Sequence, residues 1–445
     1  MLQDDRTPML LVILDGLGDR QSSGLQGMTP CEAAQTQVLD QLAIAGQSGV
    51  LIPFGLGQST SSETSHWSLF GFEDIPFVGR AALEGAGVGH TLPENTPMFH
   101  LALRQGLVKK EGIYLGSRAR RSNDDADARD LFSAIDGQDI EGVRFRQLPL
   151  RTGECVLIAE NAVSRDVSDS DALFDHVHPW MRPVALTGAP SGAKTFASIL
   201  ERWLLMSHTL LNNHPINERR EAKGQTVLNV PVTKWASFID PGMPDFETHA
   251  GVAGAAVTDA ALYRGFASLL DMKSIDIPYD RGDPKGDMER RIEAATSLLQ
   301  TSDFVHVHVK ATDEAGHAKD PKFKRDIIEQ TVAGLHQLEE LSKDTVVAVT
   351  GDHATPSTGS LLHSGDPTPF VIAGPDVDRD QVECFGERYS AQGMLGRLRA
   401  KDVLPVMAGF ANRPFFRGHQ PGPYRTIALP NNPEPMTVPV SRRDL

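Results

Sequence analysis

The stretch "MLLVILDGLGDR", residues 9–20, decides the fold class. It opens with six apolar residues, a run of strand length, and continues directly into a sequence typical of a tight turn. This pattern predicts a buried parallel strand that ends in a loop. Similar apolar runs followed by polar residues occur later, at "FVHVHV" (304–309), "TVVAVT" (345–350) and "FVIAG" (370–374).

Helical patterns lie between these runs, for example "DMERRIEAATSLLQ" (287–300) and "DIIEQTVAGLHQLEEL" (326–341). Strands that alternate with helices predict a doubly wound α/β sheet. In such sheets the ligand site lies outside the carboxyl ends of the strands. The residues directly after the strands are therefore the candidates for function.

The chain has 445 residues, enough for two domains or for one domain with an insertion, since single cores stop growing at roughly 250 to 300 residues. Its middle part lacks the strand and helix alternation and contains strand-like "GVRFRQLPL" (142–150) and basic "GSRARRS" (116–122). We expect residues 1–89 and 226–413 to form the main domain, residues 90–225 to form a smaller inserted α+β domain, and the proline-rich residues 414–445 to form an extended arm.

Composition excludes several classes of protein. The net charge of −15 argues against a nucleic-acid partner, which needs a basic surface. No apolar stretch approaches the roughly 20 residues that span a bilayer, and the first residues do not resemble a secretory signal. Three cysteines, Cys31, Cys155 and Cys384, lie too far apart in sequence to indicate a disulfide framework or a thiolate metal site. We expect a cytoplasmic protein with no nucleic-acid or membrane partner.

Acidic and histidine side chains gather directly after the predicted strands. Three Asp and three His lie there or shortly beyond: Asp15, Asp313, His317, Asp352, His353 and His363. Carboxylate and imidazole together suit Mn²⁺ or Zn²⁺, whereas Ca²⁺ and Mg²⁺ prefer oxygen ligands. Six ligands are too many for one catalytic ion that keeps an open position and about right for two. The set predicts a two-metal site.

The stretch "STSSETSHWSLFGF", residues 59–72, places several hydroxyl groups before an apolar run. A Ser hydroxyl is a poor nucleophile unless a base or a metal activates it. Two neighbouring metals are a recurring device for phosphoryl transfer. The stretch therefore predicts a Ser nucleophile at the start of a helix; the alternative is a polar loop that caps the next helix.

Motifs along the chain follow the order "ILDGLGDR", "SSETSHWSLFGF", "GRAALEGAGVG", "HPINERR", "HVKATDEAGHAKD" and "GDHATPSTGSLLHSGDPTPFVIAG". In this order they resemble the archaeal-type, cofactor-independent (2,3-bisphosphoglycerate-independent) phosphoglycerate mutases of the alkaline phosphatase superfamily. The resemblance extends from residue 8 to about residue 410. It implies an alkaline-phosphatase-like sheet with an inserted domain.

The resemblance also implies roles for individual residues. Ser62 would be the nucleophile and become a phosphoserine. One divalent metal would be held by Asp313, His317 and His363. The other would be held by Asp15, Ser62, Asp352 and His353. The ions would be Mn²⁺ or Zn²⁺, with Mg²⁺ and Co²⁺ as alternatives.

The reaction implied by the resemblance moves a phosphoryl group between the 3- and 2-hydroxyls of glycerate through the phosphoenzyme. It needs a closed cleft, for which the inserted domain would serve as a lid, and cationic groups that hold carboxylate and phosphate. The candidates for substrate binding are Arg80, Arg118, Arg120, Arg121 and Lys234. The alternative for the arginines is a solvated surface patch.

The sequence departs from the family pattern at several places. Glu63 and Ser65 replace the Asp and Ala of the usual nucleophile motif, and no Gly-Pro follows Arg80. "NVPVTKWAS" (229–237) stands where a Gly-rich segment is expected, and "LIAENAVS" (157–164) lacks an expected basic pattern. We expect these changes to lie in the substrate-facing half and to indicate a related phosphorylated or phosphonate substrate. A phosphohydrolase and a non-catalytic binding protein on the same fold are the other hypotheses.

Overall fold

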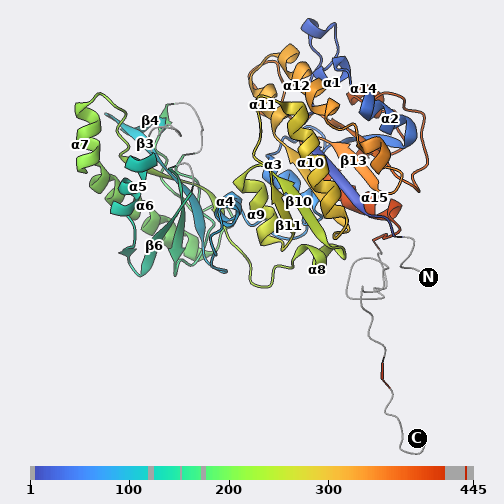
Figure 1. Cartoon of the computed structure of the whole chain (residues 1–445). Coiled ribbons are helices and arrows are strands. Elements are labelled where there is room, and N and C mark those ends of the chain that lie inside the picture. The colour runs from blue at the N-terminus through green and yellow to red at the C-terminus, as the bar shows by residue number, and fades with distance from the viewer. Residues whose placement is uncertain (1–5, 119–124, 151–152, 172–176, 416–435, 438–445) are drawn as a thin grey trace, which may run out of the picture. The chain divides into compact units, whose positions relative to one another are not determined.

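The chain divides into two compact units in a computed structural model that describes all residues except 1–5, 119–124, 151–152, 172–176, 416–435 and 438–445 (Figure 1). Unit 1 comprises Met1–Asp74, Pro244–Val257 and Ile277–Leu445. Unit 2 comprises Ile75–Met243 and Thr258–Asp276. The expected arm at 414–445 lies almost entirely outside the described residues.

The sheet of unit 1 is built around a buried strand, β1. Its strands are β1 (Met9–Leu14), β2 (Gln47–Leu51), β10 (Gly254–Thr258), β12 (Phe304–Val309), β13 (Val346–Thr350), β14 (Thr368–Ala373) and β15 (Gly396–Leu398). They lie in the order β10-β12-β1-β13-β14-β2-β15. Every residue of β1 is fully buried, because both faces of the sheet are covered, and this explains why the strand is uniformly apolar.

Strands β12, β1 and β13 run parallel, as the sequence predicts, and Val12 pairs with both Val307 and Val349. Strand β10, which is not among the strands expected from the sequence, is parallel to β12. Strand β14 is a correction: it pairs antiparallel with β13, whereas its apolar run predicts a parallel strand. A parallel partner needs a crossover connection, usually a helix. Residues 351–367 between these strands contain no helix, so the chain turns back on itself.

Helices cover the sheet of unit 1. The helical segments are η1 (Ser23–Leu25), α1 (Pro30–Ala33), α2 (Gln37–Ala45), α3 (Ser62–Leu69), α8 (Phe246–Ala250), α10 (Pro284–Leu299), α11 (Ala311–His317), α12 (Pro321–Ala333), α13 (Leu338–Leu341), α14 (Glu387–Ser390) and α15 (Ala400–Phe410). The caps of α10 and α12 are the side chains of Asp283 and Asp320, each followed by proline, a combination that favours helix starts. The helix predicted over 326–341 is two helices, since Gly334 ends α12.

Unit 2 is an α+β unit. Its strands are β3 (Met98–Lys109), β4 (Gly112–Arg118), β5 (Gln138–Ile140), β6 (Val143–Pro149), β7 (Cys155–Glu160), β8 (His178–Pro179), β9 (Val230–Ser237) and β11 (Lys273–Asp276). Its helices are α4 (Arg80–Gly87), α5 (Asp125–Ala134), α6 (Ser191–Asn212), α7 (Pro215–Ala222) and α9 (Ala261–Leu269). The main sheet has the order β5-β6-β7-β3-β4-β8, with β9 paired to β3. Its core includes the stacked rings of Phe145 and Trp203, 5.0 Å apart.

The limits of unit 2 differ from the expected 90 and 225. Strand β9 lies beyond residue 225 but pairs antiparallel with β3. Helix α4 lies before residue 90 but packs against α9, which comes much later in the chain. Contacts between segments far apart in the chain leave no local signal in composition. The expected boundaries therefore assign both α4 and β9 to the main domain. Among the described residues, no helix has the length and apolar character needed to cross a membrane.

Candidate functional site

The predicted ligands meet at the carboxyl edge of the unit 1 sheet. Asp15 directly follows β1, and Asp313 lies in α11, which begins just after β12. Asp352 and His353 directly follow β13. Ser62 is the first residue of α3, so its side chain lies at a helix N-terminus.

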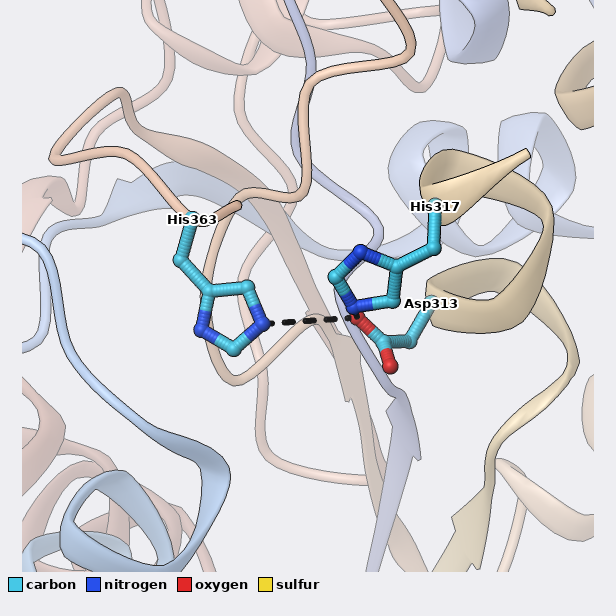
Figure 2. A group of neighbouring side chains, drawn as sticks. All are labelled: Asp313, His317 and His363. Carbon is cyan, nitrogen blue, oxygen red and sulfur yellow. Dashed lines mark ion pairs between the residues drawn. The ribbon is translucent and has the colours of Figure 1, made fainter. Parts of the chain in front are cut away.

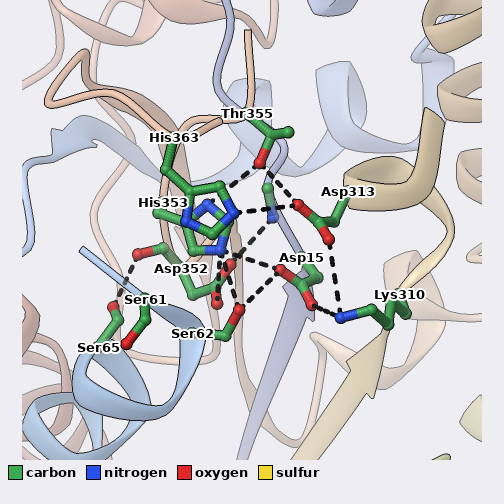
Figure 3. Close-up of polar contacts among 12 residues, drawn as sticks. Asp15, Ser61, Ser62, Ser65, Lys310, Asp313, Asp352, His353, Thr355 and His363 are labelled. Carbon is green, nitrogen blue, oxygen red and sulfur yellow. Dashed lines mark hydrogen bonds and ion pairs between the residues drawn. The ribbon is translucent and has the colours of Figure 1, made fainter. Parts of the chain in front are cut away.

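The Ser62 hydroxyl points into this group (Figure 3). It donates to Asp15 Oδ1 at 3.3 Å, and its oxygen lies 3.0 Å from His353 Nε2. The same nitrogen lies 3.2 Å from Asp15 Oδ1. The hydroxyl is therefore held by an acidic and an imidazole side chain from two separate strands.

Figure 2 shows a second group, formed by Asp313, His317 and His363. The Nε2 atoms of His317 and His363 lie 3.1 Å and 3.7 Å from Asp313 Oδ1. His363 is oriented by a hydrogen bond between its Nδ1 and the carbonyl oxygen of Thr60, which leaves Nε2 facing the carboxylate. One atom from each residue lies within 4.8 Å of the others, a spacing that can hold a metal ion.

Asp15, Asp313 and His353 form a similar group with the same 4.8 Å spacing. The approach of Asp313 to Asp15 depends on Gly16, which has a φ of +62°. A Cβ on Gly16 would lie 2.8 Å from Asp313 Oδ1 and 2.4 Å from Thr355 Oγ1. Glycine is thus needed at position 16 for two reasons: the turn after β1 requires its left-handed backbone, and Asp313 and Thr355 leave no space for a side chain.

Asp352 carries an unsatisfied buried carboxylate oxygen. Its Oδ1 accepts a hydrogen bond from the backbone N–H of Gly16, whereas Oδ2 is buried with no hydrogen-bond partner among the described residues. Burial and the nearby charge of Asp15 raise the pKa of Asp352 to about 7. Such a carboxylate beside imidazole nitrogens fits a divalent cation, which would supply the missing partner.

Two cationic or donor groups that the sequence reasoning missed contact Asp15. His308 Nε2 lies 3.1 Å from Asp15 Oδ2, and Lys310 Nζ lies 3.7 Å from the same oxygen and 3.6 Å from Asp313 Oδ2. Burial alone raises the pKa of Asp15, but Lys310 and the hydrogen bonds from His308 and His353 outweigh it and hold that pKa well below its usual value. The position of His308 and Lys310 at the end of an apolar strand is the signal that could have found them.

Lys324 ties the two ligand loops together. This fully buried side chain of α12 donates through Nζ to the carbonyl oxygens of Gly16, Gly18 and Thr355 at 2.9, 3.1 and 2.8 Å. It also pairs with Asp19 at 3.1 Å. No sequence signal identifies it, because a Lys in an amphipathic helix is usually solvent-exposed.

In unit 2, a buried carboxylate gathers several cations. Asp171 pairs with Lys234 at 2.7 Å, Arg104 at 2.9 Å and Arg118 at 3.3 Å. His178 Nε2 lies 3.0 Å from the same carboxylate. These residues are here named the Asp171 cluster. A second carboxylate, Asp169, also interacts with Lys234. Arg and Lys side chains are the usual donors to carboxylate and phosphate groups, so the cluster is a candidate for contact with an anionic ligand.

Arg80 belongs to a neighbouring chain of ionic contacts in unit 2. Its Nε lies 2.9 Å from Glu84, whose other oxygen lies 2.8 Å from His100 Nδ1. His100 Nε2 lies 3.7 Å from Glu154. Of the five predicted substrate residues, Arg118 and Lys234 come together, Arg80 lies in this separate group, and Arg120 and Arg121 are outside the described residues.

Comparison with known proteins shows the family to which the chain belongs. A family model described as the metalloenzyme superfamily matches residues 7–408. The 2,3-bisphosphoglycerate-independent phosphoglycerate mutase of Pyrococcus abyssi is 35% identical over 409 residues, which cover 91% of this chain and 97% of that protein. The chain belongs to this family of metalloenzymes. The mutase of Thermoplasma volcanium is 32% identical over 413 residues, covering 92% of this chain and 98% of that protein.

Solved structures agree with the fold. A protein of Pyrococcus horikoshii matches with a TM-score of 0.75 and 30% identity, covering 93% of this chain and all of that one. The cofactor-independent phosphoglycerate mutase of Thermoplasma acidophilum matches with a TM-score of 0.64 and 27% identity, covering 91% of this chain and 100% of that one. These matches confirm the doubly wound sheet with an inserted smaller domain that the sequence predicts. The family match confirms the prediction that the chain belongs to a family of metal-dependent enzymes.

One departure from the family pattern lies elsewhere than the sequence predicts. The hydroxyl of Ser65 is fully buried and donates to the backbone carbonyl of Asp352 at 2.7 Å. Ser65 therefore supports a ligand loop of unit 1 and is not part of a substrate-facing surface. His66, from the same motif, contacts the backbone oxygen of Ser62 through Nδ1 at 2.8 Å, and burial lowers its pKa to about 3, so its ring is neutral.

We predict that Lys324→Met destabilises the folded protein by about 3 to 5 kcal/mol, because it leaves Asp19 as an uncompensated buried charge. The free energy of unfolding from urea denaturation measures the effect. Lys322→Met, an exposed change on the same helix, is the control and should stay within about 0.5 kcal/mol of wild type. Equal stability of the two variants would contradict the role of Lys324.

The His100 contacts predict a pH dependence of stability. Burial disfavours the charged ring, but Glu154 and Glu84 outweigh burial and raise the pKa of His100 from 6.5 to about 9. The contribution of the charged His100 ring to the free energy of unfolding is therefore fully present below pH 6.5 and is lost as the pH rises through about 9. At about pH 6, His100→Gln should be less stable than wild type by on the order of 2 kcal/mol, and the difference should shrink by about pH 9.5. A difference in unfolding free energy that does not change between these pH values would refute this assignment.

Proposed function

We propose that the chain interconverts 3-phosphoglycerate and 2-phosphoglycerate through a phosphoserine at Ser62. The observation that carries the proposal is the position of the Ser62 hydroxyl, at a helix N-terminus and within 3.3 Å of Asp15 and His353. Backbone N–H groups at a helix start favour phosphate. The 2,3-bisphosphoglycerate-independent phosphoglycerate mutase of Pyrococcus abyssi, which is 35% identical over 91% of this chain, supports the same substrate.

The chain's residues fit two divalent metal ions. Asp313, His317 and His363 would hold one. Asp15, Ser62, Asp352 and His353, which lie close together, would hold the other. When bound, the ions supply positive charge beside the nucleophile and the phosphoryl oxygens. Mixed carboxylate and imidazole donors favour Mn²⁺ or Zn²⁺ over Ca²⁺, with Mg²⁺ and Co²⁺ as alternatives.

The reaction balances without an external acceptor. The Ser62 hydroxyl loses its proton and attacks phosphorus, the bond to the 3-oxygen of glycerate breaks, and that oxygen takes up a proton. The 2-hydroxyl then loses its proton and attacks the phosphorus of the phosphoserine, the bond between phosphorus and the Ser62 oxygen breaks, and that oxygen takes up a proton, which restores the Ser62 hydroxyl. Arg118 and Lys234 of the Asp171 cluster, together with Arg80, would bind the carboxylate and phosphate of the substrate.

A related phosphorylated or phosphonate metabolite is the second candidate substrate. The segment 229–237, which differs from the expected Gly-rich pattern, contains Lys234 of the Asp171 cluster. The change thus falls on a residue proposed to bind the carboxylate or phosphate of the substrate.

We predict that the protein with Mn²⁺ converts 3-phosphoglycerate to the 2-phospho isomer, as followed by ³¹P NMR. Ser62→Ala should abolish turnover while the fold is kept, because no other hydroxyl in the described part of the chain contacts both the Asp15 carboxylate and His353 Nε2. Ser61→Ala is the matched control: this neighbouring hydroxyl lies 3.1 Å from the Thr64 hydroxyl at the helix start, away from the proposed ligands, and should not be needed. Steady release of inorganic phosphate without isomer would favour a hydrolase, and neither product would overturn the glycerate assignment.

We further predict about two equivalents of Mn²⁺ or Zn²⁺ per chain after reconstitution, measured by elemental analysis. His317→Ala should lower this by about one equivalent, because it removes a ligand of one site only. His336→Ala is the control, since His336 is 53% exposed and lies apart from the predicted ligands. Well under one equivalent in wild type would favour a non-catalytic binding protein.

A further inference from the structure

Trp235 has an unusual backbone conformation for a bulky residue. Its φ is +51°, in the left-handed region that favours glycine. The register between β3 and β9 explains why: Met98 pairs with Ser237, but His100 pairs with Lys234, so β9 has one extra residue at this point. In a β-bulge of this kind glycine commonly takes the left-handed position. This chain places a tryptophan there.

Contacts within unit 2 hold Trp235 in this conformation. Its backbone N–H donates to Asp169 Oδ1 at 3.0 Å. Its ring lies 4.3 Å from the guanidinium carbon of Arg80 and 4.9 Å from the ring of His100. Strained backbone of this sort persists where surrounding contacts enforce it, and it concentrates at functional sites.

Gly79 brings Arg80 to the ring. This glycine precedes α4, has a φ of +89°, and approaches the end of β9 so closely that a Cβ would lie 2.4 Å from Ser237 Oγ and 2.7 Å from the carbonyl oxygen of Ala236. Any side chain here would push the start of α4 away from Trp235. Arg80, the first residue of α4, is thus fixed against the indole.

The indole is close to both charged groups of unit 2. The Arg80 guanidinium lies over the ring, and Glu84 accepts a hydrogen bond from the Nε of the same guanidinium. Lys234 Nζ, from the Asp171 cluster, lies 5.6 Å from the same ring. The contact with the indole and the pair with Glu84 together restrain the Arg80 side chain.

We propose that Trp235 is a specificity-determining residue for the anionic substrate, an inference that rests on the proposed role of Arg80 and Lys234 in substrate binding. By orienting Arg80 and occupying the space beside Lys234, the indole favours a compact phosphorylated acid of three carbons. It disfavours acids with a longer carbon chain.

Calorimetric binding of 3-phosphoglycerate and of 6-phosphogluconate, a six-carbon phosphorylated acid, to the metal-loaded full chain tests this. Trp235→Gly suits the left-handed backbone and removes the ring, and Trp235→Asn does the same with a residue that tolerates this conformation. Both should weaken 3-phosphoglycerate binding by about threefold to thirtyfold. Both should also reduce the preference over 6-phosphogluconate by about tenfold or more. Trp235→Phe keeps a ring and should stay within about threefold of wild type.

Asp271→Gly is the matched backbone control, because Asp271 has the same φ of 51° in unit 2 and, within the described residues, contacts neither Arg80 nor the Asp171 cluster. It should leave both affinities unchanged. Unchanged affinities and preference in Trp235→Gly and Trp235→Asn, or an equal loss in Asp271→Gly, would overturn the proposal. If wild type binds 3-phosphoglycerate without isomerising it, the proposed function fails, but the affinities of the Trp235 variants still test the proposed role of Trp235. If wild type binds neither acid, both proposals fail.

Discussion

Repulsion among the buried carboxylates of Asp15, Asp313 and Asp352 is the constraint on which unit 1 depends. Each is almost fully buried, and they meet at one edge of the sheet. Burial and the charge of Asp15 raise the pKa of Asp352 to about 7. Burial and Asp15 act in the same direction on Asp313, but the hydrogen bond from His317 and the charges of Lys310 and His353 outweigh them and hold the pKa of Asp313 below its usual value. Such a cluster is costly without compensating positive charge. Lys310 and the imidazoles supply part of it, and divalent cations fit the remainder.

The same edge must also be held rigid, and the chain does this with buried polar contacts. Lys324 joins the loops after β1 and β13 through three carbonyl oxygens, and Ser65 anchors the Asp352 backbone from α3. Lys324 and Ser65 contact backbone oxygens of the ligand loops and do not contact the side chains of the proposed ligands. They position a site whose ligands come from segments more than three hundred residues apart in sequence.

Much of this could be read from the sequence because both faces of the central sheet are buried. A strand such as β1 is then a continuous apolar run, and the residue after it, Asp15, is marked by position alone. The sequence could not give the direction of β14, which depends on the connection, or the limits of unit 2, which depend on the β3–β9 pairing. Lys324, Asp171 and the left-handed Trp235 were missed because their partners are distant in the chain. Arg118 and Lys234 were found as candidates, but only the fold shows that they share Asp171.

The central claim is that Ser62 carries the phosphoryl group between the two positions of glycerate. Acid quenching of the metal-loaded protein during turnover with 3-phosphoglycerate, followed by peptide mass spectrometry, tests it most directly. The account predicts one phosphoryl group on the peptide that contains Ser62, localised to that side chain and lost in Ser62→Ala. A phosphoryl group on a different residue, or turnover with none on the protein under conditions that preserve phosphoserine, would contradict the account.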